Sequence, residues 1–280
     1  MCRKFSFAGG ELPLGKKTYL MGILNVTPDS FYDGGRYFDP PAAVERALRL
    51  AEEGADIIDI GALSTRPNAD RADEAEELRR LSAVLPAVRK ALSLPISVDT
   101  YRPAVVRYAL DAGADIINDV SGGFNPETAA SVKAYGAGWV LMHAGPENAK
   151  TETEAAYPLG VVNHVQLFFD EVAEKAAAFG IPEEKLCMDP GFGFAKNIRQ
   201  NQTLLRGMPQ LDTGRSALLC ALSRKRFIRA AACGETDDAV LAATLTADLF
   251  AAYSGADILR IHDVAAHRNM TAAFDCLLRE

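Results

Sequence analysis

The amino-acid sequence predicts an α/β fold, a single-domain TIM barrel of (β/α)8 type, and three observations support this prediction. Short apolar runs of β type recur eight times along the 280 residues. Segments with helical periodicity lie between them. The tripeptide Gly-Ala-Asp occurs at three helix-to-strand junctions, beginning at Gly54, Gly113 and Gly255. A strand–helix unit repeated eight times over roughly 250 residues is the pattern of this barrel.

The predicted strands are mostly continuous apolar segments rather than alternating ones, which is typical of parallel strands covered by helices. A lead-in over residues 1–17 precedes them. The strands are expected at 18–26, 55–62, 95–100, 114–120, 137–143, 185–191, 216–223 and 257–263.

The predicted helices begin and end at residue types that commonly start and stop helices. The segment 41–53 opens on a proline pair and stops before Gly54, a residue type that favours the left-handed turn after a helix. A doubly wound sheet is the alternative fold, but Asn25 is followed by no glycine-rich phosphate loop. The other helices are expected at 72–92, 103–112, 126–135, 161–179, 237–253 and 265–278.

Composition limits the classes of function. With 49% hydrophobic and 24% charged residues, the chain resembles an ordinary globular protein. Its formal charge of −7 argues against broad nucleic-acid binding, although a local cationic pocket can still hold a small anion. No apolar run reaches the length of a membrane span, and the N-terminus does not read as a secretory signal, so a cytoplasmic protein is expected. The five cysteines are widely spaced, which predicts free thiols rather than disulfides or a zinc site.

Polar side chains stand at the C-terminal end of every predicted strand. Active sites of TIM barrels lie at this end, so we expect these side chains to converge on one site. Each one alone has a structural alternative, since Asp119 or Asp263 for example can cap the following helix. The polar candidates are Asn25, Arg66, Asp99, Asn118, Asp189, Ser223, Lys225, Arg260 and His262, and the apolar Met142 and Phe194 stand beside them.

These side chains sort into chemical groups. The carboxylates and amide of Asp99, Asn118 and Asp189 suit a flat heterocycle that presents several N–H donors. Asn25 is an oxygen ligand of the kind that Mg²⁺ takes alongside substrate phosphates. A second set supplies positive charge and donors for an anion, namely Arg66, Lys225, Arg260 and His262.

Seven motifs lie in order along nearly the whole chain, and they include Ser64-Thr65-Arg66-Pro67 and Ser223-Arg224-Lys225. The full set lies at 22–31, 64–67, 97–100, 117–123, 189–194, 223–225 and 260–264. Together these motifs resemble those of the dihydropteroate synthases. The resemblance implies a cytoplasmic, homodimeric TIM-barrel transferase of folate biosynthesis that uses Mg²⁺ and is the target of sulfonamides. It would condense 6-hydroxymethyl-7,8-dihydropterin diphosphate with p-aminobenzoate, giving 7,8-dihydropteroate and pyrophosphate.

The resemblance also implies a role for each matched residue. Asp189 would bind the amine and ring N–H of the pterin, with Asn118 and Asp99 on the rest of its edge. Lys225 would contact the pterin's other side, and Met142 would pack on its ring.

The other matched residues would serve the diphosphate and the second substrate. Asn25 would help to bind Mg²⁺, and Arg260 and His262 would hold diphosphate oxygens with Thr65 nearby. Asp33 would lie near the reacting centre. Diphosphate would depart first, leaving a cation at the pterin methylene that the aniline nitrogen attacks. The aminobenzoate pocket would be formed by Arg66, Pro67, Phe194 and Ser223.

Departures from the family pattern leave two alternatives open. Leu63 stands where the family has glutamate, and Ala195 stands where it has glycine, which is strained if its φ is positive. These two positions are the support for a non-catalytic pterin-binding paralogue. A methyltetrahydrofolate–corrinoid methyltransferase shares the barrel and a pterin pocket, but has less need for Arg260, His262 and the 64–67 motif.

Overall fold

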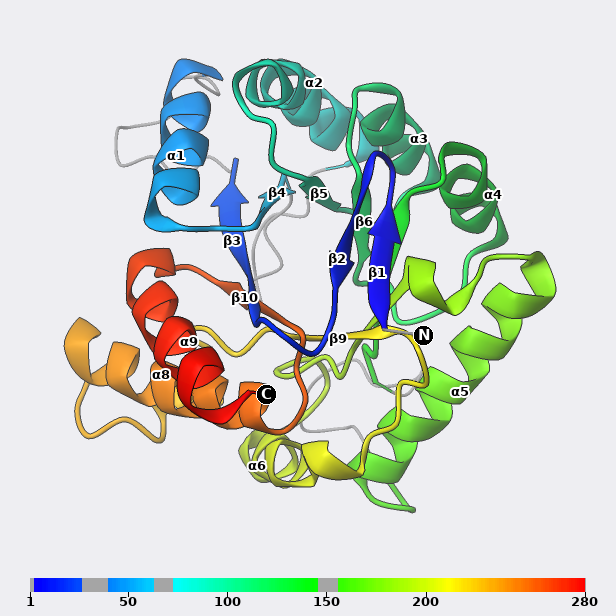
Figure 1. Cartoon of the computed structure of the whole chain (residues 1–280). Coiled ribbons are helices and arrows are strands. Elements are labelled where there is room, and N and C mark those ends of the chain that lie inside the picture. The colour runs from blue at the N-terminus through cyan, green and yellow to red at the C-terminus, as the bar shows by residue number, and fades with distance from the viewer. Residues whose placement is uncertain (1–2, 27–39, 63–72, 146–155, 280) are drawn as a thin grey trace.

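The computed structural model describes residues 3–26, 40–62, 73–145 and 156–279. Eight parallel strands close into a barrel in the order β10-β3-β4-β5-β6-β7-β8-β9, and helices surround it (Figure 1). This arrangement confirms the predicted single-domain TIM barrel. The strands are β3 (Tyr19–Asn25), β4 (Ile57–Gly61), β5 (Ile96–Asp99), β6 (Ile116–Asp119), β7 (Gly138–Met142), β8 (Leu186–Asp189), β9 (Ala217–Cys220) and β10 (Ile258–Ile261).

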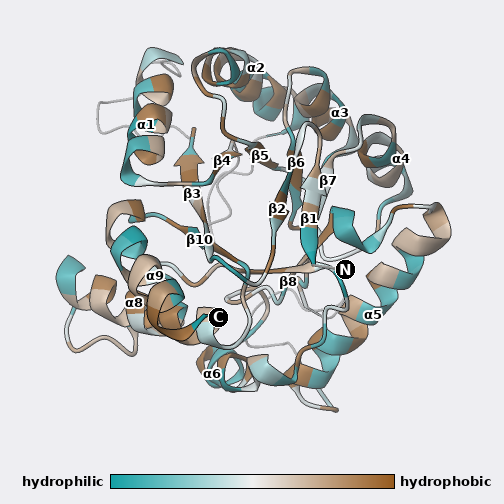
Figure 2. Cartoon of the chain, viewed as in Figure 1, coloured by the Kyte–Doolittle hydropathy of each residue, from teal (hydrophilic) through white to brown (hydrophobic). Residues whose placement is uncertain are grey.

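The helices follow the predicted ones closely, with two additions, α6 and the four-residue α7. Helix α6 begins with a reciprocal capping box, in which the side chains of Asn197 and Gln200 each accept from the other residue's backbone N–H. Figure 2 shows the strands mostly in hydrophobic colours, while the helices carry both kinds of residue. The helices are α1 (Pro40–Glu53), α2 (Glu74–Ala91), α3 (Pro103–Asp111), α4 (Pro126–Tyr135), α5 (Val161–Phe179), α6 (Ile198–Gly207), α7 (Arg226–Arg229), α8 (Asp237–Tyr253) and α9 (Val264–Leu278).

The Gly-Ala-Asp junctions have the expected backbone. Gly54, Gly113 and Gly255 all have positive φ, at 106°, 95° and 103°. Glycine adopts such angles at little steric cost, so these residues turn the chain from helix to strand. None of the described helices is both long and apolar enough to cross a membrane.

The lead-in forms an antiparallel hairpin of β1 (Lys4–Phe7) and β2 (Gly10–Pro13). Figure 1 shows it crossing one end of the barrel. Phe5 and Phe7 are buried against the start of β7, where a methyl group on Gly138 would lie only 2.7 Å from Phe5 Cζ. The hairpin therefore plugs the barrel at the N-terminal ends of its strands.

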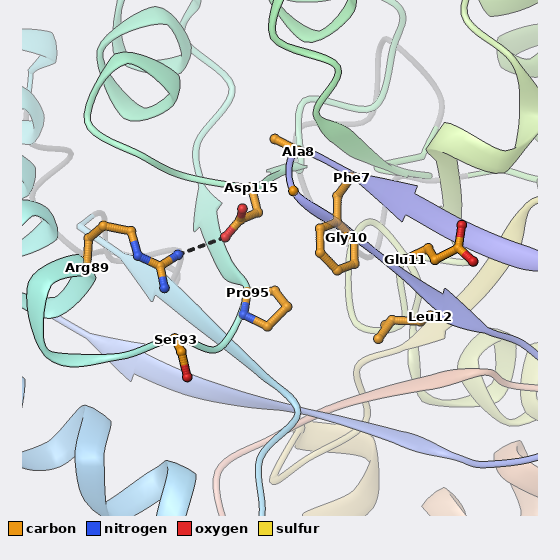
Figure 3. Close-up of a pocket in the computed structure, with 10 residues that line it drawn as sticks. Phe7, Ala8, Gly10, Glu11, Leu12, Arg89, Ser93, Pro95 and Asp115 are labelled. Atoms are coloured by element: carbon orange, nitrogen blue, oxygen red, sulfur yellow. Dashed lines mark hydrogen bonds and ion pairs between the residues drawn. The ribbon is translucent and has the colours of Figure 1, made fainter.

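A shallow cavity of about 290 Å³ lies beside this hairpin (Figure 3). Its wall includes Glu11, Arg89 and Asp115. Arg89 Nη1 donates to Asp115 Oδ2 at 3.0 Å, and Arg89 Nη2 also donates to Leu94 O at 3.0 Å. Arg89 and Asp115 are therefore paired with each other, while Glu11 Oε2 accepts from Lys4 Nζ at 2.7 Å.

The barrel interior changes from apolar to polar toward the C-terminal ends of the strands. The layer nearest the N-terminal ends of the strands packs against Phe5 and Phe7. It contains Met21, Ile57, Ile116, Val140, Cys187, Leu219 and Ile258. Two residues further along β4, β6, β8 and β10 stand Asp59, Asn118, Asp189 and Arg260. Side chains two apart on a strand share a face, so the apolar plug is followed by a polar layer.

Candidate active site

Arg260 links four strands at the centre of the polar layer. Its Nε donates to Asp59 Oδ2 at 2.7 Å, and its Nη2 donates to Asp99 Oδ2 at 2.9 Å. Asn118 Nδ2 donates to the same Asp59 oxygen at 3.3 Å. The four side chains thus join β4, β5, β6 and β10 into one hydrogen-bonded network. Three of them were expected here. Asp59 was missed because it lies inside its strand rather than at its end.

Burial sets the charge balance of this network. It raises the pKa of Asp99 to about 7; the positive charge of Arg260 opposes this shift and the negative charge of Asp59 adds to it. Burial by itself would lower the pKa of Arg260, but the Asp59 and Asp99 carboxylates outweigh it and raise that pKa. Arg260 therefore stays charged, while Asp99 titrates near neutrality.

The strand register places further expected residues beside the network. Asn25 pairs with Gly61, Gly61 with Asp99, and Asp99 with Asn118. A methyl group on Gly61 would lie 3.3 Å from Asn25 Oδ1 and 3.8 Å from Asp99 Cβ. Glycine therefore leaves room between two polar side chains at the mouth of the barrel. Across the barrel, Met142 pairs with Asp189.

Asp189 begins a tightly held loop after β8. Its Oδ1 accepts from Gly191 N at 2.7 Å. Burial raises the pKa of Asp189, while the positive charge of Lys225 and this hydrogen bond oppose the rise. Lys225 Nζ donates to Phe192 O and lies 5.0 Å from the Phe194 ring centroid. Expected site residues from β8 and from the segment after β9 are therefore neighbours.

The pKa of Lys225 is also shifted from its ordinary value. Burial lowers its pKa to about 8, and the negative charge of Asp189 opposes that fall. A lysine so placed is charged at neutral pH and loses its proton in mildly alkaline solution.

Lys196 binds the backbone of the same loop, and the sequence did not predict it as a site residue. Its side chain is fully buried, and its Nζ donates to Gly191 O at 2.8 Å, Phe194 O at 3.1 Å and His143 O at 3.2 Å. Three carbonyl oxygens satisfy its three N–H groups, although burial lowers the pKa of Lys196 well below its usual value. Lysine is mostly a surface residue, so composition offered no signal for this position.

The backbone of Ala195 has a positive φ, so the condition under which the sequence predicted strain at this residue is met. Its φ is 45°, in the left-handed region that favours glycine. Tyr157 Oη donates to Ala195 O at 3.0 Å. A side chain on Gly145 would overlap the Ala195 methyl group. The methyl group therefore sits in space that Gly145 leaves open.

Ser223 and His262 meet at the ends of β9 and β10. Ser223 Oγ lies 2.9 Å from His262 Nδ1 and accepts from His262 N at 3.3 Å. Between Ser223 and Lys225, Arg224 has a left-handed φ of 57°. Its Nε and Nη2 donate to the two oxygens of Asp263, each at 2.8 Å. This bidentate pair ties the segment after β9 to the segment after β10, and the sequence did not predict it.

Four expected site residues lie outside the described residues: Asp33, Thr65, Arg66 and Pro67. Leu63 lies outside them as well. Their assignments stay predictions.

The oxygen atoms near Asn25 can be compared with the ligands that the expected Mg²⁺ needs. Within the described ranges, no three His, Cys, Asp or Glu side chains are grouped to hold a metal ion. Asn25 Oδ1 is a neutral oxygen at the barrel mouth, partly exposed. Magnesium commonly takes one or two protein oxygens together with substrate phosphates and water. Asn25 fits that mode of binding.

The geometry therefore places acceptors and cations around one mouth. Carboxylates and an amide suit the N–H donors of a flat ring, and Arg260, Lys225 and His262 suit an anion. Preorganised charges and donors of this kind bind polar ligands and stabilise charge that develops during a reaction.

Comparisons with known proteins agree with this chemistry. The family model for the pterin binding enzymes matches residues 21–262. Dihydropteroate synthase from Synechocystis is 40% identical over 268 residues, covering 95% of this chain and 92% of that protein.

Two solved structures of Xanthomonas albilineans dihydropteroate synthase are similar throughout. One contains 4-aminobenzoic acid and has a TM-score of 0.89 at 40% identity, covering 99% of this chain and 98% of that one. The other is a complex with 7,8-dihydropteroate and has a TM-score of 0.86 at 39% identity, covering 98% of each chain. The chain therefore belongs to the pterin-binding enzyme family and, within it, to the dihydropteroate synthases, which are transferases.

Proposed function

We propose that this protein condenses 6-hydroxymethyl-7,8-dihydropterin diphosphate with p-aminobenzoate, giving 7,8-dihydropteroate and pyrophosphate. The observation that carries this proposal is the polar layer at the barrel mouth. There Asp99, Asn118 and Asp189 offer acceptors beside the partly buried cations Arg260 and Lys225. Relatives solved with 4-aminobenzoic acid and with 7,8-dihydropteroate support the choice of substrates.

In this proposal the N–H groups along the pterin edge donate hydrogen bonds to the acceptor side chains of the polar layer. Asp189 takes the exocyclic amine and the ring N–H with its carboxylate oxygens. Asp99 and Asn118 hold the rest of the edge, Lys225 contacts the opposite side of the ring, and Met142 packs on it. Each hydrogen bond to a buried charged group is worth about 1.5 to 3 kcal/mol, which makes the edge selective for a ring rich in N–H donors.

The reaction proposed at this site is a substitution at the methylene carbon. The C–O bond to diphosphate breaks, and its electron pair leaves with pyrophosphate. The cation left on the methylene is favoured by the carboxylates of Asp99 and Asp189. The aniline nitrogen then forms the C–N bond, and the proton that it loses passes to pyrophosphate or solvent. Arg260 and His262 stabilise the departing anion.

Mg²⁺ fits the same proposal as a partner of the diphosphate. It would be held through Asn25 and substrate oxygens, and when bound it neutralises charge on the leaving group.

The aminobenzoate is proposed to bind beside the pterin methylene. Ser223 and Phe194 line this part of the mouth, and Arg66 and Pro67 are proposed to complete it. Lys225, 5.0 Å from the Phe194 ring centroid, lies where the two substrates would meet. Sulfonamides resemble aminobenzoate in shape, and we propose that they compete for this pocket.

We further propose a cytoplasmic homodimer. Large apolar side chains are exposed on adjacent helices α8 and α9, where a second copy would cover them. The thiols of Cys187 and Cys220 are buried and free, in keeping with a reducing compartment. Light scattering tests the dimer, which should dissociate when Phe250 is replaced by glutamate. The large apolar residues exposed on α8 and α9 are Leu249, Phe250, Tyr253, Leu277 and Leu278.

Pyrophosphate release from the purified protein tests the reaction. Dihydropterin diphosphate, Mg²⁺ and p-aminobenzoate are supplied together and then omitted one at a time. Release that needs all three supports the proposal. Binding of the pterin diphosphate without release would favour a non-catalytic paralogue. Methyl transfer from methyltetrahydrofolate to a corrinoid, without pyrophosphate release, would favour the methyltransferase.

A further inference from the structure

Asp59 is a buried charge beneath the residues expected to touch substrate. It interrupts the apolar run of β4, between Ile58 and Ile60, and its side chain is 0% exposed. An isolated carboxylate at such a depth is costly, and the cost is offset only by good partners. Its partners therefore show what the residue does.

Both partners of Asp59 are proposed to contact the pterin diphosphate substrate, Asn118 at the ring edge and Arg260 at the diphosphate. Its Oδ2 accepts from Arg260 Nε at 2.7 Å and from Asn118 Nδ2 at 3.3 Å. Its Oδ1 is buried and has no hydrogen-bond partner among the described residues. One carboxylate oxygen therefore holds two substrate-facing side chains from two other strands.

This contact orients the amide of Asn118. An ionised carboxylate can only accept hydrogen bonds, so it takes the NH₂ side of the amide. Asn118 Oδ1, also buried, has no hydrogen-bond partner in the described part of the chain. The amide oxygen is thus kept as an acceptor for a ring N–H.

The same carboxylate fixes the guanidinium of Arg260. Asp59 holds Nε and Asp99 holds Nη2, so two carboxylates from neighbouring strands set the plane of the group. Fixing a side chain before the ligand arrives removes part of the entropy cost of binding.

We propose that Asp59 is a positioning residue for the pterin substrate, which it orients through Asn118 and Arg260 without touching it. This inference rests on the proposed function. Removing both contacts should therefore weaken the use of the pterin and leave the use of aminobenzoate nearly unchanged.

The test compares Asp59→Leu with Asp59→Asn. Leucine has a similar size and removes both acceptors, whereas asparagine keeps one acceptor oxygen and removes the charge. We expect kcat/KM for dihydropterin diphosphate to fall about 100-fold in the leucine variant and about tenfold in the asparagine variant. KM for p-aminobenzoate at saturating pterin should stay within about twofold.

Asp257→Asn is the matched control. Asp257 is another buried carboxylate, paired with Arg3 at 3.0 Å, but at the opposite end of the barrel. It should lower the melting temperature and leave both substrates' parameters unchanged. A second control is Asn118→Ala combined with Asp59→Asn, whose joint loss should be smaller than the product of the single losses.

Three results would overturn the inference. The first is an Asp59→Asn variant that uses the pterin as well as the wild type does. The second is an equal loss for both substrates that only follows the loss of stability. The third is a double variant whose losses simply multiply. If Asp59→Leu does not fold, the asparagine variant decides. If the wild type makes no dihydropteroate, the proposed function fails, and calorimetric binding of dihydropterin diphosphate to wild type and Asp59→Asn decides this inference.

Discussion

Gly191→Ala is the substitution with the best-defined effect on the site. Gly191 has a φ of 67°, where an L-residue costs about 1 to 2 kcal/mol. A Cβ there would overlap the His143 carbonyl oxygen and lie 2.9 Å from its carbon. Both neighbours are backbone atoms, so no flexible side chain can yield.

The strain must move the loop that holds Asp189. Moving Gly191 N by an ångström breaks its 2.7 Å hydrogen bond to Asp189 Oδ1, which is worth about 1.5 to 3 kcal/mol. We expect Gly191→Ala to lower the free energy of unfolding by about 3 to 5 kcal/mol. The melting temperature should fall by about 10 °C, and kcat/KM for the pterin substrate by about tenfold or more.

Two further glycines separate the causes. Gly255 has a φ of 103° with nothing within 4 Å of the added carbon, so Gly255→Ala measures backbone strain alone, at about 1 to 2 kcal/mol. Gly123 has open space and no positive φ, so Gly123→Ala should change stability by about 0.5 kcal/mol or less. Thermal unfolding and steady-state kinetics give both readouts. The reasoning is refuted if Gly191→Ala is no worse than Gly255→Ala in stability and keeps full activity with the pterin.

Three other predictions concern titration, a salt bridge and the metal. The pH profile of kcat/KM should have an acid limb near pH 7, where Asp99 is protonated and no longer accepts as a carboxylate, and an alkaline limb near pH 8, where Lys225 loses its charge. Lys225→Arg should move only the alkaline limb upward, and a flat profile from pH 6 to 9 would contradict both assignments. In a double-mutant cycle by denaturant unfolding, alanine at Arg224 and at Asp263 should show a coupling of about 1 to 2 kcal/mol, whereas additive losses would deny the bidentate pair a role. Asn25→Ala should raise the Mg²⁺ concentration for half-maximal turnover about tenfold, and an unchanged Mg²⁺ titration would remove Asn25 from the metal site.

The barrel was predictable because its signals are local and repeated. Continuous apolar runs and positive-φ glycines such as Gly54 report strands and junctions without knowledge of the tertiary fold. The hairpin was missed because two strands of four residues have little periodicity, and the burial of Phe5 and Phe7 depends on a barrel that forms far along the chain. Helix α6 had a signal in the Asn197–Gln200 capping pair, which an analysis based on apolar periodicity passes over.

The site was predictable to the extent that strand ends define it. Asp99, Asn118 and Asp189 follow apolar runs, and the topology brings them to one mouth. Asp59 interrupts an apolar run between Ile58 and Ile60, a signal that attention to strand ends alone passes over. Lys196 could not be predicted because its burial depends on the fold of the loop after β8 and on His143, 53 residues away. The left-handed Arg224 is held by Asp263, 39 residues away, so its conformation could not be read from its neighbours in sequence.

Product identification tests the central claim most directly. The protein is incubated with dihydropterin diphosphate, p-aminobenzoate and Mg²⁺, and the products are identified by mass spectrometry for wild type and Asp189→Asn. The wild type should form 7,8-dihydropteroate and pyrophosphate in equal amounts. Asp189→Asn should keep the melting profile of the wild type but lose about 100-fold in kcat/KM for the pterin. The reason is that asparagine replaces one of the two accepting carboxylate oxygens with an NH₂ group, which is a donor. Absence of dihydropteroate from the wild type, or full activity in Asp189→Asn, would contradict the account.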